Sequence, residues 1–170
     1  LVIKKILRSS ISDLICKGVK PKFIFIGASG NKKSFSKKNL NLVCKSLNQE
    51  QKKYKIKLSG GDTAKSNKTT FTITSLGYSK KIVQRNKCKN NDDIYVTGNL
   101  GDSYLGLSIL RKKSFLKNSK QRKYFIQKYY MPDIPLKIGS KLIKFANSSI
   151  DISDGLFADL SKLINTSKLF

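Results

Sequence analysis

The chain has 170 residues with 35 Lys or Arg, 10 Asp or Glu and no His, so its formal net charge is +25. No apolar run approaches the roughly 20 residues that a membrane helix needs, which excludes a membrane-spanning role for this soluble segment. The three cysteines are far apart and no His accompanies them, which excludes a CxxC zinc site and a Cys/His nucleophile pair and suits a reducing cytoplasm.

The first half of the chain has the pattern of an α/β domain. Residues 1–18 carry Ile and Leu at helical spacing, and this helix should stop at Gly18, which suits a left-handed cap. An amphipathic helix over residues 34–54 should turn Leu40, Val43 and Leu47 inward. Strands are predicted over residues 22–28, 54–60 and 69–79.

The second half begins after a polar, linker-like segment at residues 79–93. Pro132 and Pro135 should interrupt it. The elements predicted here are a strand over 94–98, a helix over 101–113, a loop entering a helix over 112–124, a helix over 134–146, a strand over 148–153 and a helix over 154–165 opened by Asp154.

The stretch "SGGDTAKS" places Asp62 directly after Gly60 and Gly61, where we expect the strand to end. Glycines let another backbone or a phosphate come close, and an adjacent carboxylate suits Mg²⁺, which binds carboxylate and phosphate oxygens together. The alternative is a simple Gly-Gly-Asp turn.

A second group of acids lies in "SIDISDGLFADL". Strand alternation would put Asp151 and Ser153 on one face, with Asp154 at the junction with the following helix. Two carboxylates this close repel each other unless a cation or a proton lies between them. Asp154 can instead cap the helix, but capping does not account for Asp151.

Two further aspartates lie in motifs of their own. Asp13, in "ISDL", is either a ligand or an ordinary exposed helix position. In "VTGNLGDSYLGL", Asp102 is the predicted cap of a glycine-bracketed helix start whose free N–H groups can meet an anion.

In this order, the motifs "ISDLICKGVKP", "GGDT", "QRNKCKNNDDIYVTGNLGDSYLGL" and "SSIDISDGLFADL" resemble the thiamine-monophosphate kinases, a family of the aminoimidazole-ribonucleotide-synthetase-like superfamily. The resemblance extends over essentially the whole chain. It implies ATP-dependent, in-line transfer of a phosphoryl group onto thiamine monophosphate to give thiamine diphosphate, with no covalent nucleophile in the protein.

The same resemblance implies roles for individual residues. Mg²⁺ would be bound by Asp13, Asp62, Asp151 and Asp154, which should then converge in one cleft. ATP would be bound by Gly61, Asp62, Arg85 and Ser153. Arg85 is one of only four arginines in a lysine-rich chain, and its planar guanidinium suits phosphate, although it can also be an ordinary linker charge.

By resemblance, the fold is an α/β, two-domain aminoimidazole-ribonucleotide-synthetase-like fold in a cytoplasmic homodimer. Residues 1–84 would form the N-terminal ATP-binding domain, which contributes strands to the dimer interface, and residues 85–170 an incomplete C-terminal domain. The family's aspartate-rich loop would precede Leu1, the residues that hold thiamine would follow Phe170, and its "RPxPR" segment is here "MPDIP".

Two alternatives remain open at this stage. A sister enzyme of the superfamily, such as aminoimidazole-ribonucleotide or selenophosphate synthetase, would share ATP and Mg²⁺ but use another acceptor. A basic nucleic-acid-binding module would need its Lys and Arg on one face, whereas here they are spread through every segment.

Overall fold

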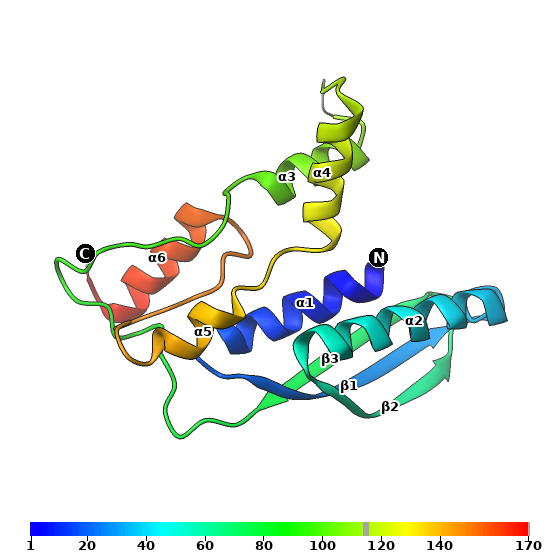
Figure 1. The fold of residues 1–170 in the computed structure, drawn as a ribbon, viewed down its shortest axis with the longest axis horizontal. Helices are drawn as coiled ribbons and strands as arrows, with labels where there is room; N and C mark the ends of the chain where they lie inside the picture. Colours follow the sequence, from blue (N-terminus) through cyan, green and yellow to red (C-terminus); the bar gives the residue numbers. More distant parts are fainter. Residues whose placement is uncertain (114–115, 170) are drawn as a thin grey trace.

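The computed structural model describes residues 1–113 and 116–169, and its first half is a three-stranded sheet covered on one face by two helices (Figure 1). The helices are α1 (Val2–Ile15) and α2 (Lys37–Tyr54), and the strands are β1 (Pro21–Gly30), β2 (Lys57–Lys65) and β3 (Thr70–Gly77). In the order β2-β1-β3, the central strand β1 runs parallel to β2 and antiparallel to β3. The other face of the sheet is open (Figure 1).

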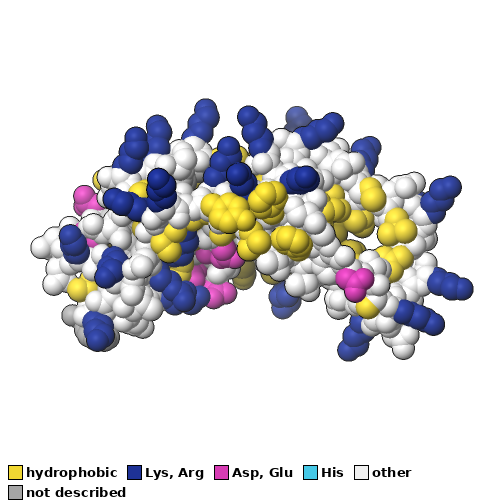
Figure 2. Space-filling model, turned by 90° about the horizontal axis from the view of Figure 1, so that it is seen from below, with side chains coloured by type: hydrophobic (Ala, Val, Ile, Leu, Met, Phe, Trp, Pro, Cys, Tyr) yellow, Lys and Arg dark blue, Asp and Glu magenta, His cyan; other side chains and the backbone are white. Residues whose placement is uncertain are grey.

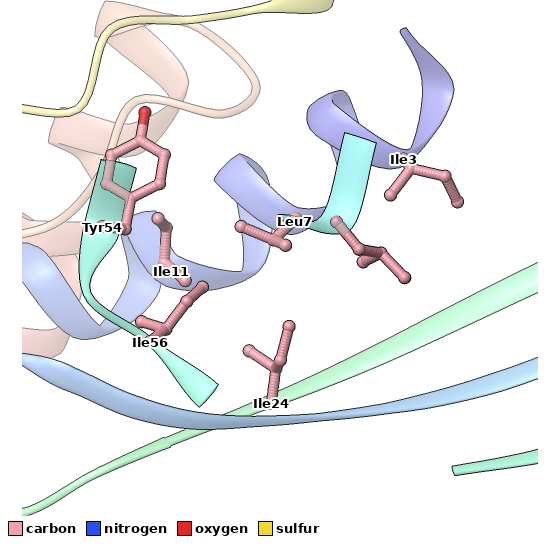
Figure 3. Packing of buried hydrophobic residues seen from close by; sticks show 7 residues of the cluster. Ile3, Leu7, Ile11, Ile24, Tyr54 and Ile56 are labelled. Carbon is pink, nitrogen blue, oxygen red and sulfur yellow. The ribbon is translucent and has the colours of Figure 1, made fainter. Parts of the chain in front are cut away.

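The hydrophobic core lies between this sheet and its two helices (Figure 3). Ile3, Leu7 and Ile11 recur at four-residue spacing along α1, so one face of the helix points at the sheet. They pack against a set of buried residues from β1, α2 and the approach to β2: Ile24, Leu47, Tyr54 and Ile56. The prediction for Leu47 is confirmed, and Val43 packs against the core, but that for Leu40 is wrong because this residue is 43% exposed.

The strand predicted to end at Gly60 continues through the glycines to Lys65. Gly60 and Gly61 pair with Phe25 and Ile26 of β1. The parallel ladder therefore continues through both glycines and provides their backbone hydrogen bonds. At Gly61 a Cβ atom would lie 2.1 Å from the carbonyl oxygen of Ile26. The absence of a side chain at Gly61 therefore lets the backbone of β1 come close to β2. Because Gly60, Gly61 and Asp62 lie inside a strand, the Gly-Gly-Asp turn is excluded.

The second half contains four helices in the described residues: α3 (Asp102–Leu110), α4 (Ser119–Tyr130), α5 (Leu136–Leu142) and α6 (Leu156–Ser167). Helices α3 and α4 pack against each other and project from the rest of the chain, whereas α5 lies beside the end of α1 (Figure 1). The polar linker is confirmed, because no helix or strand lies between Gly77 and Asp102.

The strands predicted over residues 94–98 and 148–153 are wrong. Their alternating pattern suits a strand, but a strand also requires a neighbour to complete its hydrogen bonds, and neither segment has one among the described residues. Among residues 1–113 and 116–169, no helix is both long enough and apolar enough to cross a membrane.

Candidate functional site

Asp13 and Asp151, which are 138 positions apart, lie together at the end of α1. Burial, followed by the negative charge of Asp13 and a hydrogen bond with its carboxyl group, raises the pKa of Asp151. Asp13 is exposed and Asp151 is half-buried. Two carboxyl groups in this arrangement offer hard oxygen ligands to a cation, whose charge would relieve their mutual repulsion.

Lys17 holds the segment of Asp151 against α1. Its ammonium group donates a 2.7 Å hydrogen bond to the carbonyl of Ser149, two residues before Asp151. The carbonyl of Lys17 accepts a 3.0 Å bond from the N–H of Val83, so the linker is attached to the same point. Through Lys17, the segment of Ser149 and the linker at Val83 are both attached near Asp13.

Cys16 borders the same pair, and its thiol donates a 3.2 Å hydrogen bond to the carbonyl of Asp13. Burial is the main reason that the pKa of this thiol is raised to about 11. The positive charge of Lys17 lowers the pKa and the negative charge of Asp151 raises it, both by smaller amounts. The thiol is therefore protonated and unreactive at neutral pH.

Arg85 lines an open depression of about 500 Å³ next to this region. Lys17 and Asn86 line it as well, with further lining residues at Ile82, Val83, Gln84 and Thr166. The carbonyl of Arg85 accepts a 3.0 Å bond from Thr166 of α6, whereas its guanidinium makes no hydrogen bond or ion pair within the described ranges. The depression thus presents two cations to an incoming anion.

Asp154 lies beside an aspartate that the sequence analysis did not single out, Asp159. The ammonium group of Lys162 binds both carboxylates, at 2.6 Å from Asp154 and 2.8 Å from Asp159. Asp154 and Ser153 are exposed, whereas Asp159 is 1% exposed. The signal for Asp159 was its place in the first turn of a helix, from which a carboxylate can reach the preceding backbone.

Two predicted helix caps are wrong. Helix α6 begins at Leu156 after Gly155, whose φ of 136° favours glycine, so Asp154 does not open it. Helix α3 begins after Gly101, and Asp102 accepts a 2.8 Å hydrogen bond from the hydroxyl of Tyr124 on α4. In both cases glycine takes the position before the helix because the chain turns there with positive φ.

Asp62 lies apart from the other three predicted ligands. It pairs with Gly27 of β1, and because the neighbouring Ile26 packs against the core, Gly27 and Asp62 face the open side of the sheet. Its carboxylate accepts a 2.7 Å bond from the N–H of Thr63 and is exposed. Gly61 precedes it in the same strand.

The structure therefore brings Asp13 and Asp151 together, places Asp154 near the buried Asp159, and keeps Asp62 on the other face of the sheet. Among the residues it describes, no group of three or more His, Cys, Asp or Glu side chains is arranged to hold a metal. The Asp13–Asp151 pair has the proximity that the four-aspartate prediction requires, and the metal assignment stays a prediction.

Residues 4–79 match the family of AIR synthase related proteins, N-terminal domain. The chain as a whole is 40% identical, over 166 residues, to the thiamine-monophosphate kinase of Buchnera aphidicola subsp. Schizaphis graminum (strain Sg). That alignment covers 94% of this chain and 49% of the relative. Its first half thus resembles the N-terminal domain of AIR synthase related proteins, which agrees with the superfamily that the motifs indicated. Within it, the resemblance to the thiamine-monophosphate kinases is confirmed.

Solved structures of these kinases share the fold. Thiamine monophosphate kinase from Aquifex aeolicus superposes with a TM-score of 0.88 at 26% identity, covering 98% of this chain and 58% of that one. AaThiL complexed with AMPPCP and TMP superposes with a TM-score of 0.87 at 26% identity, covering 99% and 55%. The predicted α/β fold is thereby confirmed, and the chain spans about half the length of the curated relatives it matches.

Proposed function

We propose that this chain is part of a thiamine-monophosphate kinase. In the reaction, a phosphate oxygen of thiamine monophosphate attacks the γ-phosphorus of ATP, the bond from that phosphorus to the β-phosphate oxygen breaks, and thiamine diphosphate and ADP result. The observation that carries the proposal is the 40% identity to such a kinase over 94% of the chain. A related structure was solved with AMPPCP, an ATP analogue, and TMP.

The residues present fit Mg²⁺ at the Asp13–Asp151 pair. Burial is the largest cause of the raised pKa of Asp151, and the second is the negative charge of Asp13, so the two carboxyl groups lie close together. Asp154 would join them once it is released from Lys162. Asp62 would hold a cation against the ATP phosphates from its separate position. When bound, Mg²⁺ supplies positive charge that offsets the negative charge of the transferring phosphoryl group.

The chain's own cations suit the phosphates of ATP. Arg85 and Lys17 line one depression. The guanidinium of Arg85, which makes no hydrogen bond or ion pair with the described residues, is available for a bidentate contact. Ser153 and Gly61 are exposed, so Ser153 can offer its hydroxyl, and Gly61, which precedes Asp62 in β2, would contact ATP through its backbone. These groups bind and orient ATP, and no covalent nucleophile is needed.

We propose that the protein is a homodimer that uses the open face of the sheet. Phe25, Leu76 and Tyr78 are 38%, 42% and 71% exposed, and Tyr78 packs edge-on against Phe23. Figure 2, which views the molecule from below, shows apolar side chains gathered in the middle of this face with Lys and Arg around them. Exposed apolar surface of this kind marks a contact with another protein surface.

Division into domains at residues 84 and 85 is also our proposal. The first half has a closed core, whereas many large apolar side chains of the second half are exposed, including Tyr95 at 85% and Phe157 at 83%. The C-terminal domain would therefore need further chain to cover them. A cytoplasmic location stays a prediction from the free cysteines.

Asp62→Asn tests the function in the protein that contains this chain. The variant keeps the size of the side chain and an acceptor for the N–H of Thr63, but removes the charge that would face a cation. Formation of thiamine diphosphate from ATP and thiamine monophosphate at saturating Mg²⁺ should fall by about 100-fold or more, with an unchanged melting temperature.

Asp93→Asn is the matched control, because Asp93 is exposed and makes no hydrogen bond or ion pair with the described residues. Activity of the Asp62→Asn protein equal to that of this control would refute the role of Asp62. A wild-type protein that turns over ATP only with another acceptor would instead identify a sister enzyme. Nucleic-acid binding has no support, because exposed lysines lie on α2, β2, α4 and α5 alike.

A further inference from the structure

The loop that leads into α6 is held by one buried carboxylate, that of Asp159. Its Oδ2 atom accepts hydrogen bonds from three consecutive backbone N–H groups, those of Ser153, Asp154 and Gly155, at 2.9, 3.0 and 3.2 Å. Its Oδ1 atom accepts a 2.8 Å bond from Lys162. Asp159 is 1% exposed, so water does not compete for these bonds.

This arrangement requires an unusual backbone. Three consecutive N–H groups can converge on one oxygen only if the chain curls around it, and Gly155, with φ of 136°, makes part of that curve. A buried carboxylate without such partners would be strongly unfavourable. The loop and Asp159 therefore specify each other's position.

The held loop carries two of the residues to which the kinase family assigns binding roles. Ser153 is a proposed ATP contact and Asp154 a proposed Mg²⁺ ligand, and both donate their backbone N–H to Asp159. Asp151 lies two residues before this loop, beside Asp13. A shift of the loop would move Ser153 and Asp154 relative to Asp151 and α1.

We infer that Asp159 is a positioning residue that fixes the Ser153–Asp154–Gly155 loop and thereby sets where Ser153 and Asp154 meet nucleotide and cation. Lys162 binds both carboxylates, and Asp154 would leave it to meet the cation while Asp159 keeps the loop in place. The positioning role rests on the proposed function, but the hydrogen bonds do not. Groups that orient metal ligands in this way typically contribute about 10- to 100-fold in metal affinity.

The test compares Asp159→Ala, Asp159→Asn and the control Asp93→Ala in the protein that contains this chain. Amide hydrogen exchange without Mg²⁺ or nucleotide reports on the loop itself. In Asp159→Ala, exchange at Ser153, Asp154 and Gly155 should accelerate about tenfold or more, whereas Asp159→Asn, which keeps one acceptor oxygen, should lie between Ala and wild type. The Asp93 variant removes an exposed carboxylate and should exchange like wild type.

The second measurement is the dissociation constant of Mg²⁺ with AMPPCP, by calorimetric titration. It should rise about tenfold or more in Asp159→Ala, less in Asp159→Asn, and stay unchanged in the control. If Asp159→Ala fails to fold, the Asn variant alone should show both effects.

Unchanged exchange at the three amides would overturn the inference outright. Accelerated exchange with an unchanged Mg²⁺ dissociation constant would overturn the positioning role while leaving the proposed function intact. The titration of the wild-type protein tests the proposed function by itself. If that protein binds neither Mg²⁺ nor AMPPCP, the proposed function is overturned and the positioning role with it.

Discussion

Arg8 and Glu50 form a buried, two-pronged ion pair between α1 and α2. The guanidinium Nε and Nη2 atoms donate to the two carboxylate oxygens at 2.7 and 3.0 Å, and the residues are 4% and 1% exposed. Nη1 of Arg8 also donates to the carbonyl of Pro132, at 3.1 Å. One arginine therefore joins the two helices of the first half to a segment of the second.

Removing one partner of this pair should be costly. Glu50→Gln leaves the Arg8 charge buried without its counter-charge, so the free energy of unfolding should fall by about 3–5 kcal/mol. Urea denaturation at neutral pH measures the change. The double variant Arg8→Met, Glu50→Leu should recover most of it, because an apolar pair of similar volume leaves no unpaired charge; equal losses in the single and double variants would contradict this account.

Asp151→Asn should stabilise the protein without Mg²⁺. The pKa of Asp151 is raised above its usual 3.8 by burial and by Asp13, so the folded state penalises the charged form. The penalty is fully present above the folded pKa and is relieved as the pH falls through it toward 3.8. The variant should therefore melt higher than wild type at neutral pH, and the two melting temperatures should converge as the pH falls.

The same variant should lose its response to Mg²⁺. A ligand at about 100 times its dissociation constant stabilises the state that binds it by about 2.7 kcal/mol, and Asp151→Asn should gain almost none of this. Thermal unfolding with and without Mg²⁺ and AMPPCP measures the difference. Full stabilisation of the variant would remove Asp151 from the proposed ligands.

Gly61→Ala should loosen β2, because the added Cβ would lie 2.1 Å from the carbonyl oxygen of Ile26 on β1. Backbone shifts of this kind typically cost about 1–3 kcal/mol, which chemical denaturation can resolve. Gly27→Ala in the same sheet is the control, since its nearest new neighbour is 3.9 Å away at the Cβ of Thr72. Equal stability of the two variants would argue against the strand pairing at Gly61.

Leu76→Lys should dissociate the proposed homodimer, because a charge would replace an apolar side chain on the open face of the sheet. Sedimentation velocity should show a dimer for wild type and a monomer for the variant. Leu42→Lys makes the same change at a 57% exposed position on α2, which lies over the other face, and should leave the dimer intact. A dimer that survives Leu76→Lys would place the interface elsewhere.

Local sequence determined the helix–strand order of the first half and the family of the chain. Apolar residues at helical and alternating spacing are enough to define α1, α2, β1 and β3, because each element buries one of its own faces. The linker after β3 followed from its polarity, and Gly18, with φ of 76°, turns as predicted. Specific motifs such as "GGDT" and "SSIDISDGLFADL" carried the family resemblance.

Tertiary structure alone decided what depends on a neighbour. Whether residues 57–65 form a strand through Gly61 was set by β1, which pairs with them, and residues 94–98 and 148–153 lack such a partner. The approach of Asp151 to Asp13 depends on the bond from Lys17 to Ser149, and the loop of Asp154 depends on Asp159. Hydrogen bonds and charges act between atoms close in space, and only the folded chain determines which atoms those are.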